Sequence, residues 1–298
     1  MTLARSRPKA LAALVLLAVI WGYNWVLMKV AVRYAPPFDF AAMRVFYGAL
    51  SLFVVLWLQG RSMKLQRGAG TLGYGLLQSG GTIGLSTWAL VSGGAGKTAV
   101  LTYTMSFWTL LFAWLLLGET LRLRQWASLG VAAAGLLFVV LPIDIEQAPV
   151  SKGLAILAGI AWALASILLK RMDHGDSIDP LGFTAWQMLF GSLPLIAVSW
   201  LTPSAPVEWT PAFILVLLYN IGPGSAVAWL LWLYALRHLS TSLSSLGALL
   251  TPTLSIAMAA LQLGEVPKGT ELLGMVLILC ALALSIPNLP RAISRRHL

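Results

Sequence analysis

Charged residues are scarce in this chain. Asp, Glu, Lys and Arg together make up 10% of its 298 residues, whereas hydrophobic residues make up 59%. Soluble domains carry about 25% charged residues, and so few charged side chains could not cover the apolar surface of a soluble protein of this length. The mean hydropathy of +0.84 agrees with this conclusion. The composition therefore excludes an ordinary soluble domain and predicts an all-α membrane protein that crosses the bilayer several times.

Cysteine and histidine are also rare. The single cysteine, Cys280, lies inside an apolar run, and the three histidines are far apart in loops or in the tail (His174, His238 and His297). One cysteine excludes both a disulfide framework and a cysteine-based metal site. We therefore expect no resident metal and no cofactor.

No carboxylate lies in the middle of an apolar run. All ten lie in predicted loops or at run ends: Asp39, Glu119, Asp144, Glu146, Asp173, Asp176, Asp179, Glu208, Glu265 and Glu271. A proton relay or a cation exchanger usually needs an acidic side chain within the membrane, so the sequence favours a neutral or zwitterionic cargo. The net charge of +10 comes from basic residues scattered through short loops without a nucleic-acid motif, so we expect no nucleic-acid partner.

Ten apolar runs are long enough to cross a bilayer, which takes about 20 residues in a helix. Most Lys and Arg residues lie in the segments on the same side as the N-terminus. Segments rich in Lys and Arg face the cytoplasm, so both termini are expected there. The ten runs are 10–32, 38–58, 71–92, 98–117, 123–141, 153–171, 180–200, 211–236, 241–262 and 270–288.

The second half of the chain repeats features of the first. The fourth and ninth runs both end in Leu-Gly-Glu, at 117–119 and 263–265, and Phe40 to Gly48 matches Phe183 to Gly191. Each half contains five predicted helices. Because five is odd, the two copies must cross the membrane in opposite directions, which is typical of transporters that alternate access to a site between the halves.

The spacing of Trp and Lys repeats as well. Lys29 follows Trp21 by eight residues, and Lys170 follows Trp162 by the same interval. These matches predict a first repeat at 1–142, a linker loop at 143–152, and a second repeat with a basic tail at 153–298.

These features together resemble a known family. The chain is similar to the drug/metabolite transporter superfamily of the EamA type, through Trp21-Gly22-Tyr23-Asn24, Arg44, the two Leu-Gly-Glu endings and the two five-helix halves. Its length and aromatic content resemble the aromatic and neutral amino-acid exporters of the YddG type. The resemblance implies ten helices around a central cavity, in a bacterial inner membrane.

Glycine and proline interrupt two equivalent runs. Breaks at corresponding positions of two halves point to a central site and to hinges, whereas close helix packing is the other interpretation of such small residues. Proline within a run also predicts a kink. The predicted hinge residues are Gly80, Gly81, Gly222, Pro223, Gly224 and Pro252.

Aromatic and polar residues inside the runs are the candidates for contact with a substrate. Aromatic side chains could line a cavity for apolar groups, although packing or contact with lipid explains many of them. Polar residues within spans tend to face the bundle interior. Arg44 could bind a substrate carboxylate, pair with carbonyls at a helix end, or extend to the interface. The candidates are Trp21, Asn24, Arg44, Gln78, Tyr103, Trp162, Trp186 and Gln187.

The sequence thus predicts an exporter of neutral amino acids, with preference for larger apolar or aromatic ones, that works by alternating access. An exporter of the same fold with another cargo, such as a nucleoside, a sugar derivative or a drug, stays open at this point. An integral membrane enzyme is disfavoured, because no catalytic cluster, spaced metal motif or Gly-x-Ser-x-Gly sequence occurs.

Overall fold

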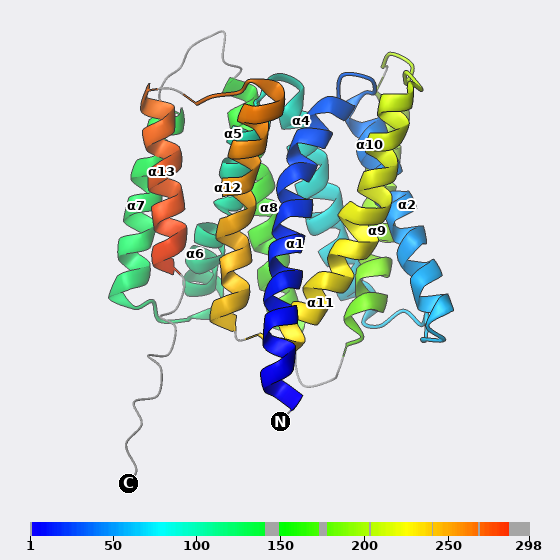
Figure 1. Cartoon of the computed structure of the whole chain (residues 1–298), viewed down its shortest axis with the longest axis horizontal. Coiled ribbons are helices and arrows are strands. Elements are labelled where there is room, and N and C mark those ends of the chain that lie inside the picture. Colours follow the sequence, from blue (N-terminus) through cyan, green and yellow to red (C-terminus); the bar gives the residue numbers. More distant parts are fainter. Residues whose placement is uncertain are drawn as a thin grey trace.

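The computed structural model describes residues 2–140, 149–172, 178–202, 204–239, 241–267 and 269–285, and every regular element in these ranges is helical (Figure 1). Most of the predicted linker and the basic tail beyond residue 285 lie outside the described residues. The helices form one bundle, with the start of α1 and the end of α13 at the same end (Figure 1). We call this the amino-terminal end, and the other the opposite end.

The chain before the predicted linker forms helices α1 to α7 and one π-helical segment, η1. Their bounds are α1 Thr2–Ala31, α2 Pro37–Leu58, α3 Gly68–Gly75, η1 Leu76–Ile83, α4 Gly84–Ser92, α5 Ala95–Tyr103, α6 Met105–Leu117 and α7 Leu123–Val140. α3, η1 and α4 follow one another without a break and make one continuous rod. Thr104 alone separates α5 from α6.

The chain after the linker has a corresponding order of elements. It forms α8 Pro149–Met172, α9 Pro180–Leu201, α10 Pro211–Ile221, η3 Gly222–Val227, α11 Ala228–His238, α12 Thr241–Leu263 and α13 Gly269–Ser285. α10, η3 and α11 again make one continuous rod.

Six helical stretches of the described residues are long and apolar enough to cross a membrane. They are Pro8–Ala31, Pro37–Leu58, Ala95–Leu117, Pro149–Met172, Pro180–Leu201 and Pro211–Trp232. Three shorter apolar helices accompany them: Leu123–Val139, Leu250–Leu263 and Gly269–Leu284. Large apolar side chains such as Trp200 and Leu261 are exposed on the outside of the bundle, as contact with lipid tails requires.

Local chemistry accounts for several helix boundaries. Proline opens α2, α8, α9 and α10, where its missing N–H group costs no hydrogen bond. Gly118 and Gly264 both have φ of +68°, a left-handed conformation that glycine adopts easily and that ends many helices. The two Leu-Gly-Glu sequences therefore terminate α6 and α12.

The π-helical segments lie where glycine and proline predicted interruptions. η1 begins at Leu76 and η3 begins at Gly222, and these positions have the same spacing as Gly118 and Gly264. The two segments are therefore repeat equivalents. A π-turn is wider than an α-turn and is frequent at functional sites, so both segments are places to look for one.

Helices from the two halves interleave in the bundle. α7 lies against α13, α2 against α9, α1 against α11 and α12, and α8 against α4, α5 and α6. The α7–α13 contact is very close, since a Cβ added to Gly274 would lie 2.6 Å from the carbonyl oxygen of Gly135. The two halves consequently share one core and do not form separate domains.

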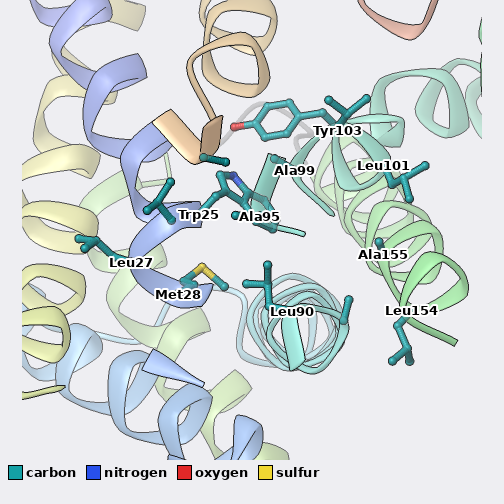
Figure 2. Packing of buried hydrophobic residues seen from close by; sticks show 14 of the residues in the cluster. Trp25, Leu27, Met28, Leu90, Ala95, Ala99, Leu101, Tyr103, Leu154 and Ala155 are labelled. Carbon is teal, nitrogen blue, oxygen red and sulfur yellow. The ribbon is translucent and has the colours of Figure 1, made fainter. Parts of the chain in front are cut away.

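The largest hydrophobic cluster of the described residues spans most of the bundle, and Figure 2 shows the part of it that α1, α4, α5 and α8 form. α1 contributes Trp25 and Met28, α4 contributes Leu90, α5 contributes Tyr103, and α8 contributes Ala155. Helices of both halves thus bury their apolar faces in one place, next to the polar residues of α1 described below.

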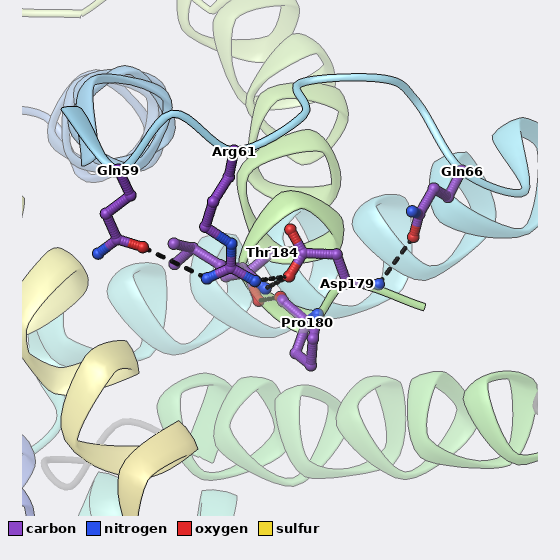
Figure 3. Close-up of polar contacts among 7 residues, drawn as sticks. Gln59, Arg61, Gln66, Asp179, Pro180 and Thr184 are labelled. Carbon is purple, nitrogen blue, oxygen red and sulfur yellow. Dashed lines mark hydrogen bonds and ion pairs between the residues drawn. The ribbon is translucent and has the colours of Figure 1, made fainter. Parts of the chain in front are cut away.

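Polar contacts join the two halves at the amino-terminal end (Figure 3). Arg61, in the loop after α2, forms an ion pair with Asp179, which caps the start of α9. The amide nitrogen of Asp179 also donates to Gln66 Oε1 at 2.8 Å. These contacts attach the loop between α2 and α3 to the second half.

Candidate functional site

Trp21 and Asn24 on α1 face the π-helical segment η3. Trp21 Nε1 donates to the carbonyl oxygen of Gly224 at 3.2 Å. Its ring centroid lies 5.9 Å from that of Trp229 and 6.3 Å from that of Trp232. A Cβ added to Gly224 would lie 3.3 Å from Asn24 Oδ1, so the absence of a side chain there lets α1 and η3 approach.

Arg44 reaches this region from α2. Its Nη1 lies 2.8 Å from Met28 Sδ, and Asn24 Nδ2 lies 3.3 Å from the same sulfur. The guanidinium also lies over the ring of Phe40, at 6.0 Å from its centroid. Met28 thus brings Arg44 and Asn24 together, and we call Asn24, Met28, Arg44 and Gly224 the polar cluster.

The charge of Arg44 is buried and has no anionic partner among the residues that the structure describes. The residue is 8% exposed, and no carboxylate of the described residues forms an ion pair with it. A guanidinium has five N–H donors, and a thioether is a weak acceptor. A buried charge without a counter-ion is costly, so this arrangement favours the entry of an anionic group such as a carboxylate.

Two buried amide oxygens nearby lack a donor. Asn24 Oδ1 and Asn220 Oδ1 have no hydrogen-bond partner among the described residues. Asn220 is fully buried in the last turn of α10, two residues before η3, and its amide nitrogen donates to Val216 O at 2.9 Å. Buried acceptors are usually satisfied, so a ligand with N–H or O–H donors fits here.

Tyr103 and Trp162 form a second aromatic group. Their ring centroids lie 5.6 Å apart, and the Tyr103 hydroxyl shares a side-chain hydrogen bond with Thr251 of α12. Tyr103 belongs to the same hydrophobic cluster as Met28 (Figure 2). Trp162 packs against that cluster. The structure therefore places these predicted residues across the shared core from the polar cluster.

Gln78 and Gln187 lie elsewhere, along η1. Gln187 is buried in α9 and accepts a hydrogen bond from Ser79 Oγ at 2.8 Å, while Gln78 Oε1 is buried without a partner among the described residues. Gly80 and Gly81 sit close to Pro194 and Ala161, at 3.1 and 3.3 Å from an added Cβ. Close packing thus accounts for the two glycines of η1.

The remaining predicted residues differ in their surroundings. Trp186 donates from Nε1 to the carbonyl oxygen of Met63 at 2.9 Å and packs on Phe53, so its contacts are near the loop after α2 and not in the polar cluster. Pro223 lies in η3, Pro252 lies inside α12, and an added Cβ on Gly222 would meet open space.

Sequence reasoning missed Met28 and Asn220 as members of this region. Met28 lies one helical turn after Asn24, but a methionine on an apolar helix looks like a packing residue. Asn220 is a polar residue inside an apolar run, two residues before Gly222, and that position could have identified it as a candidate.

A separate cavity of about 170 Å³ lies at the opposite end, between the start of α5 and the end of α12. Lys97, Glu265 and Glu271 contribute charged groups to its wall. Glu271 forms ion pairs with Lys97 and, at 3.8 Å, with Lys152. Among the described residues, no group of His, Cys, Asp and Glu could hold a metal ion.

Comparisons with known proteins agree on a family. The sequence model of the EamA-like transporter family matches twice, at residues 8–141 and 152–286. The chain is 28% identical over 281 residues to the uncharacterized transporter YoaV of Bacillus subtilis, and the matched region covers 92% of this chain and 95% of that protein. It is 27% identical over 291 residues to a probable amino-acid metabolite efflux pump of Salmonella typhimurium, covering 94% and 95%.

A solved crystal structure has the same fold. It superposes with a TM-score of 0.63 at 19% identity and covers 93% of this chain and 97% of the other. At this identity the likeness concerns the fold alone.

Proposed function

The chain belongs to the EamA-like transporter family, and from this premise we propose that this membrane transporter exports neutral amino acids, with preference for larger apolar or aromatic ones. The proposal includes ten membrane spans in two inverted repeats, 1–142 and 153–298, joined by the linker 143–152. Both termini face the cytoplasm of a bacterium. The shared position of the start of α1 and the end of α13 supports this topology (Figure 1), as does the Lys and Arg bias.

The polar cluster is the observation that carries the cargo assignment. A free amino acid has one carboxylate and one ammonium group on the same carbon. Within the described part of the chain, Arg44 supplies buried donors that have no anionic partner, and Asn24 Oδ1 is a buried acceptor that has no donor. The two groups lie on either side of Met28 Sδ. The carboxylate would displace the thioether from Arg44, and the ammonium would donate to Asn24 Oδ1.

The neighbouring aromatic side chains support an apolar cargo side chain. Trp21, Trp229 and Trp232 lie together beside Gly224. Aromatic walls with a few polar groups are typical of small-molecule sites. Two relatives are described as probable amino-acid metabolite efflux pumps, and this supports the same class of cargo here.

Counterflow into liposomes tests the proposal. Vesicles that contain the purified protein are loaded with unlabelled Phe, Trp, Thr or Met, and a labelled amino acid is supplied outside. We expect accumulation that depends on the internal load and persists without a proton gradient. Vesicles loaded with a nucleoside, or made without protein, serve as controls.

Two analogues of phenylalanine test each end of the cargo. Phenethylamine lacks the carboxylate that Arg44 would bind, and 3-phenylpropionate lacks the ammonium group that Asn24 would bind. We expect phenylalanine to compete with the labelled substrate and both analogues to compete at least about tenfold less well, as loss of a charge-assisted hydrogen bond implies. Counterflow with the nucleoside and with no amino acid would overturn the assignment.

A further inference from the structure

Two Lys–Glu pairs occupy equivalent positions of the repeats, at opposite ends of the bundle. Lys29 and Lys170 each follow the equivalent tryptophan by eight residues, and Glu119 and Glu265 each follow the left-handed glycine that ends α6 or α12. The two pairs are Lys170 with Glu119 and Lys29 with Glu265. In each pair the lysine and the glutamate come from different halves of the chain. The substrate proposal uses none of these four residues.

At the amino-terminal end the pair is formed. Lys170 Nζ, near the end of α8, forms an ion pair with Glu119, which follows the glycine that ends α6. The neighbouring Arg171 Nη2 donates to the carbonyl oxygen of Leu116 at 2.8 Å. These contacts hold the end of α8, from the second half, against the end of α6, from the first.

At the opposite end the equivalent charges have other partners. Lys29 Nζ donates to the carbonyl oxygens of Leu90 at 2.7 Å and Val91 at 3.3 Å, at the end of α4. Glu265 Oε2 accepts the Ala95 N–H at 2.6 Å, at the start of α5. A cation at a helix C-terminus and an anion at a helix N-terminus are both favourable.

Lys29 near the end of α1 and Glu265 just after α12 lie at the same end of the bundle (Figure 1) but are not paired. Both lie within the described residues, where they form no ion pair with each other, although the charge of Glu265 acts on Lys29. The cavity of about 170 Å³ lies beside Glu265. The structure thus combines a formed pair at one end with a separated pair and a cavity at the other.

We infer that the two Lys–Glu pairs form alternately during transport, and that the pair that is formed determines which end of the bundle is closed. This inference rests on the alternating access of the proposed function. In transporters built from inverted repeats, one repeat rocks against the other to alternate access, and we infer that in the second state the two repeats have exchanged these contacts. In the exchanged state Lys29 therefore pairs with Glu265, and Lys170 leaves Glu119.

The repeat also identifies where the released charges go. The equivalents of Leu90 and Val91 are Leu236 and Arg237 at the end of α11, and the equivalent of Ala95 is Thr241 at the start of α12. In the exchanged state Lys170 would donate to the carbonyl oxygens at the end of α11. Glu119 would accept from the backbone N–H groups at the start of α12. Each charge keeps a partner in both states, so the exchange leaves no ion uncompensated.

Thiol labelling measures the exchange without any knowledge of the cargo. Cys280, the single cysteine, is replaced by serine. New cysteines are placed at Ile256, which lines the cavity, and separately at its repeat equivalent, Leu110. In nanodiscs, a water-soluble maleimide should label Ile256→Cys readily and Leu110→Cys slowly. Ala205 is exposed in the loop after α9, so the labelling rate of Ala205→Cys is the reference to which the other rates are normalised.

Loss of the formed pair should favour the exchanged state. Glu119→Gln and Lys170→Gln should each raise the Leu110→Cys labelling rate by about two- to fivefold, the size expected for a solvent-exposed ion pair. The double exchange Glu119→Lys with Lys170→Glu should restore the slow rate. The matched control is Arg61→Gln, which removes another ion pair at the same end and should leave the rate unchanged.

The separated pair is tested in the Glu119→Gln background. Adding Glu265→Gln removes the Lys29–Glu265 pair of the exchanged state, while the amide oxygen can still accept from Ala95 N–H. The Leu110→Cys rate should then return toward that of the starting protein. Unchanged rates in both single variants, or no recovery with the exchanged charges, in protein that elutes as one species, would overturn the inference. If the labelling rates change as expected but counterflow detects no amino-acid transport, the inference stands and only the cargo assignment fails.

Discussion

Arg44→Met separates a substrate-binding arginine from a structural one. Methionine keeps most of the buried volume and removes the charge. In the structure the guanidinium contacts Met28 Sδ and the Phe40 ring, and no carboxylate of the described residues balances its charge. Replacing a structural partner of an ion pair should destabilise the fold, whereas removing an uncompensated buried charge should not.

Arg44→Met should weaken substrate binding without lowering the stability of the fold. A hydrogen bond to a charged group contributes about 1.5–3 kcal/mol, so loss of the carboxylate contact should raise the half-saturation concentration about 10- to 150-fold. The apparent melting temperature of Arg44→Met should stay the same or rise, because the desolvation cost of the buried charge disappears.

Counterflow at graded phenylalanine concentrations gives the first quantity, and thermal unfolding in detergent gives the second. Arg61→Met is the matched control, because Arg61 has an acidic partner, Asp179, outside the polar cluster. It should leave the half-saturation concentration unchanged. If Arg44→Met lowers the melting temperature by several degrees and transports phenylalanine with unchanged half-saturation, Arg44 is structural and the reasoning is refuted.

Two further predictions concern stability. In Gly191→Ala the new Cβ would lie 2.4 Å from the carbonyl oxygen of Gly75. We expect the free energy of unfolding to fall by about 1–3 kcal/mol. Gly153→Ala, whose Cβ meets open space, is its control and should not melt earlier. Gln187→Leu leaves the buried Ser79 hydroxyl without its acceptor and should cost about 1–3 kcal/mol. Thermal unfolding tests both predictions. An unchanged melting temperature in either Gly191→Ala or Gln187→Leu contradicts the prediction for that variant. Counterflow should be unchanged in Gln187→Leu.

Repeat equivalence predicts which positions correspond in the two halves, but it does not predict which partners those positions contact. Arg44 and Gln187 are equivalent in sequence, and both were candidates for substrate contact. In the structure Arg44 reaches Met28, whereas Gln187 bonds Ser79 between α9 and η1. The two halves are similar in backbone, but the identity of each facing residue decides which polar group has a partner and which has none.

Trp186 illustrates the same limit. Its place deep inside an apolar run made it a candidate for the wall of an aromatic cavity. Its indole N–H instead bonds the carbonyl oxygen of Met63, in the loop after α2. No local pattern at Trp186 identifies this loop as its neighbour, because the contact joins segments that are 123 residues apart in the chain.

The sequence by itself determined the membrane class, the family and the helix ends at Gly118 and Gly264. These follow from composition, from a duplicated order of motifs and from backbone preferences, which act over a few residues at a time. The tertiary structure alone decided that Lys170 pairs with Glu119 while Lys29 binds the end of α4, and that Arg44 is buried against a thioether. Such choices depend on how distant helices pack, because a buried charge takes the partner that packing brings within reach.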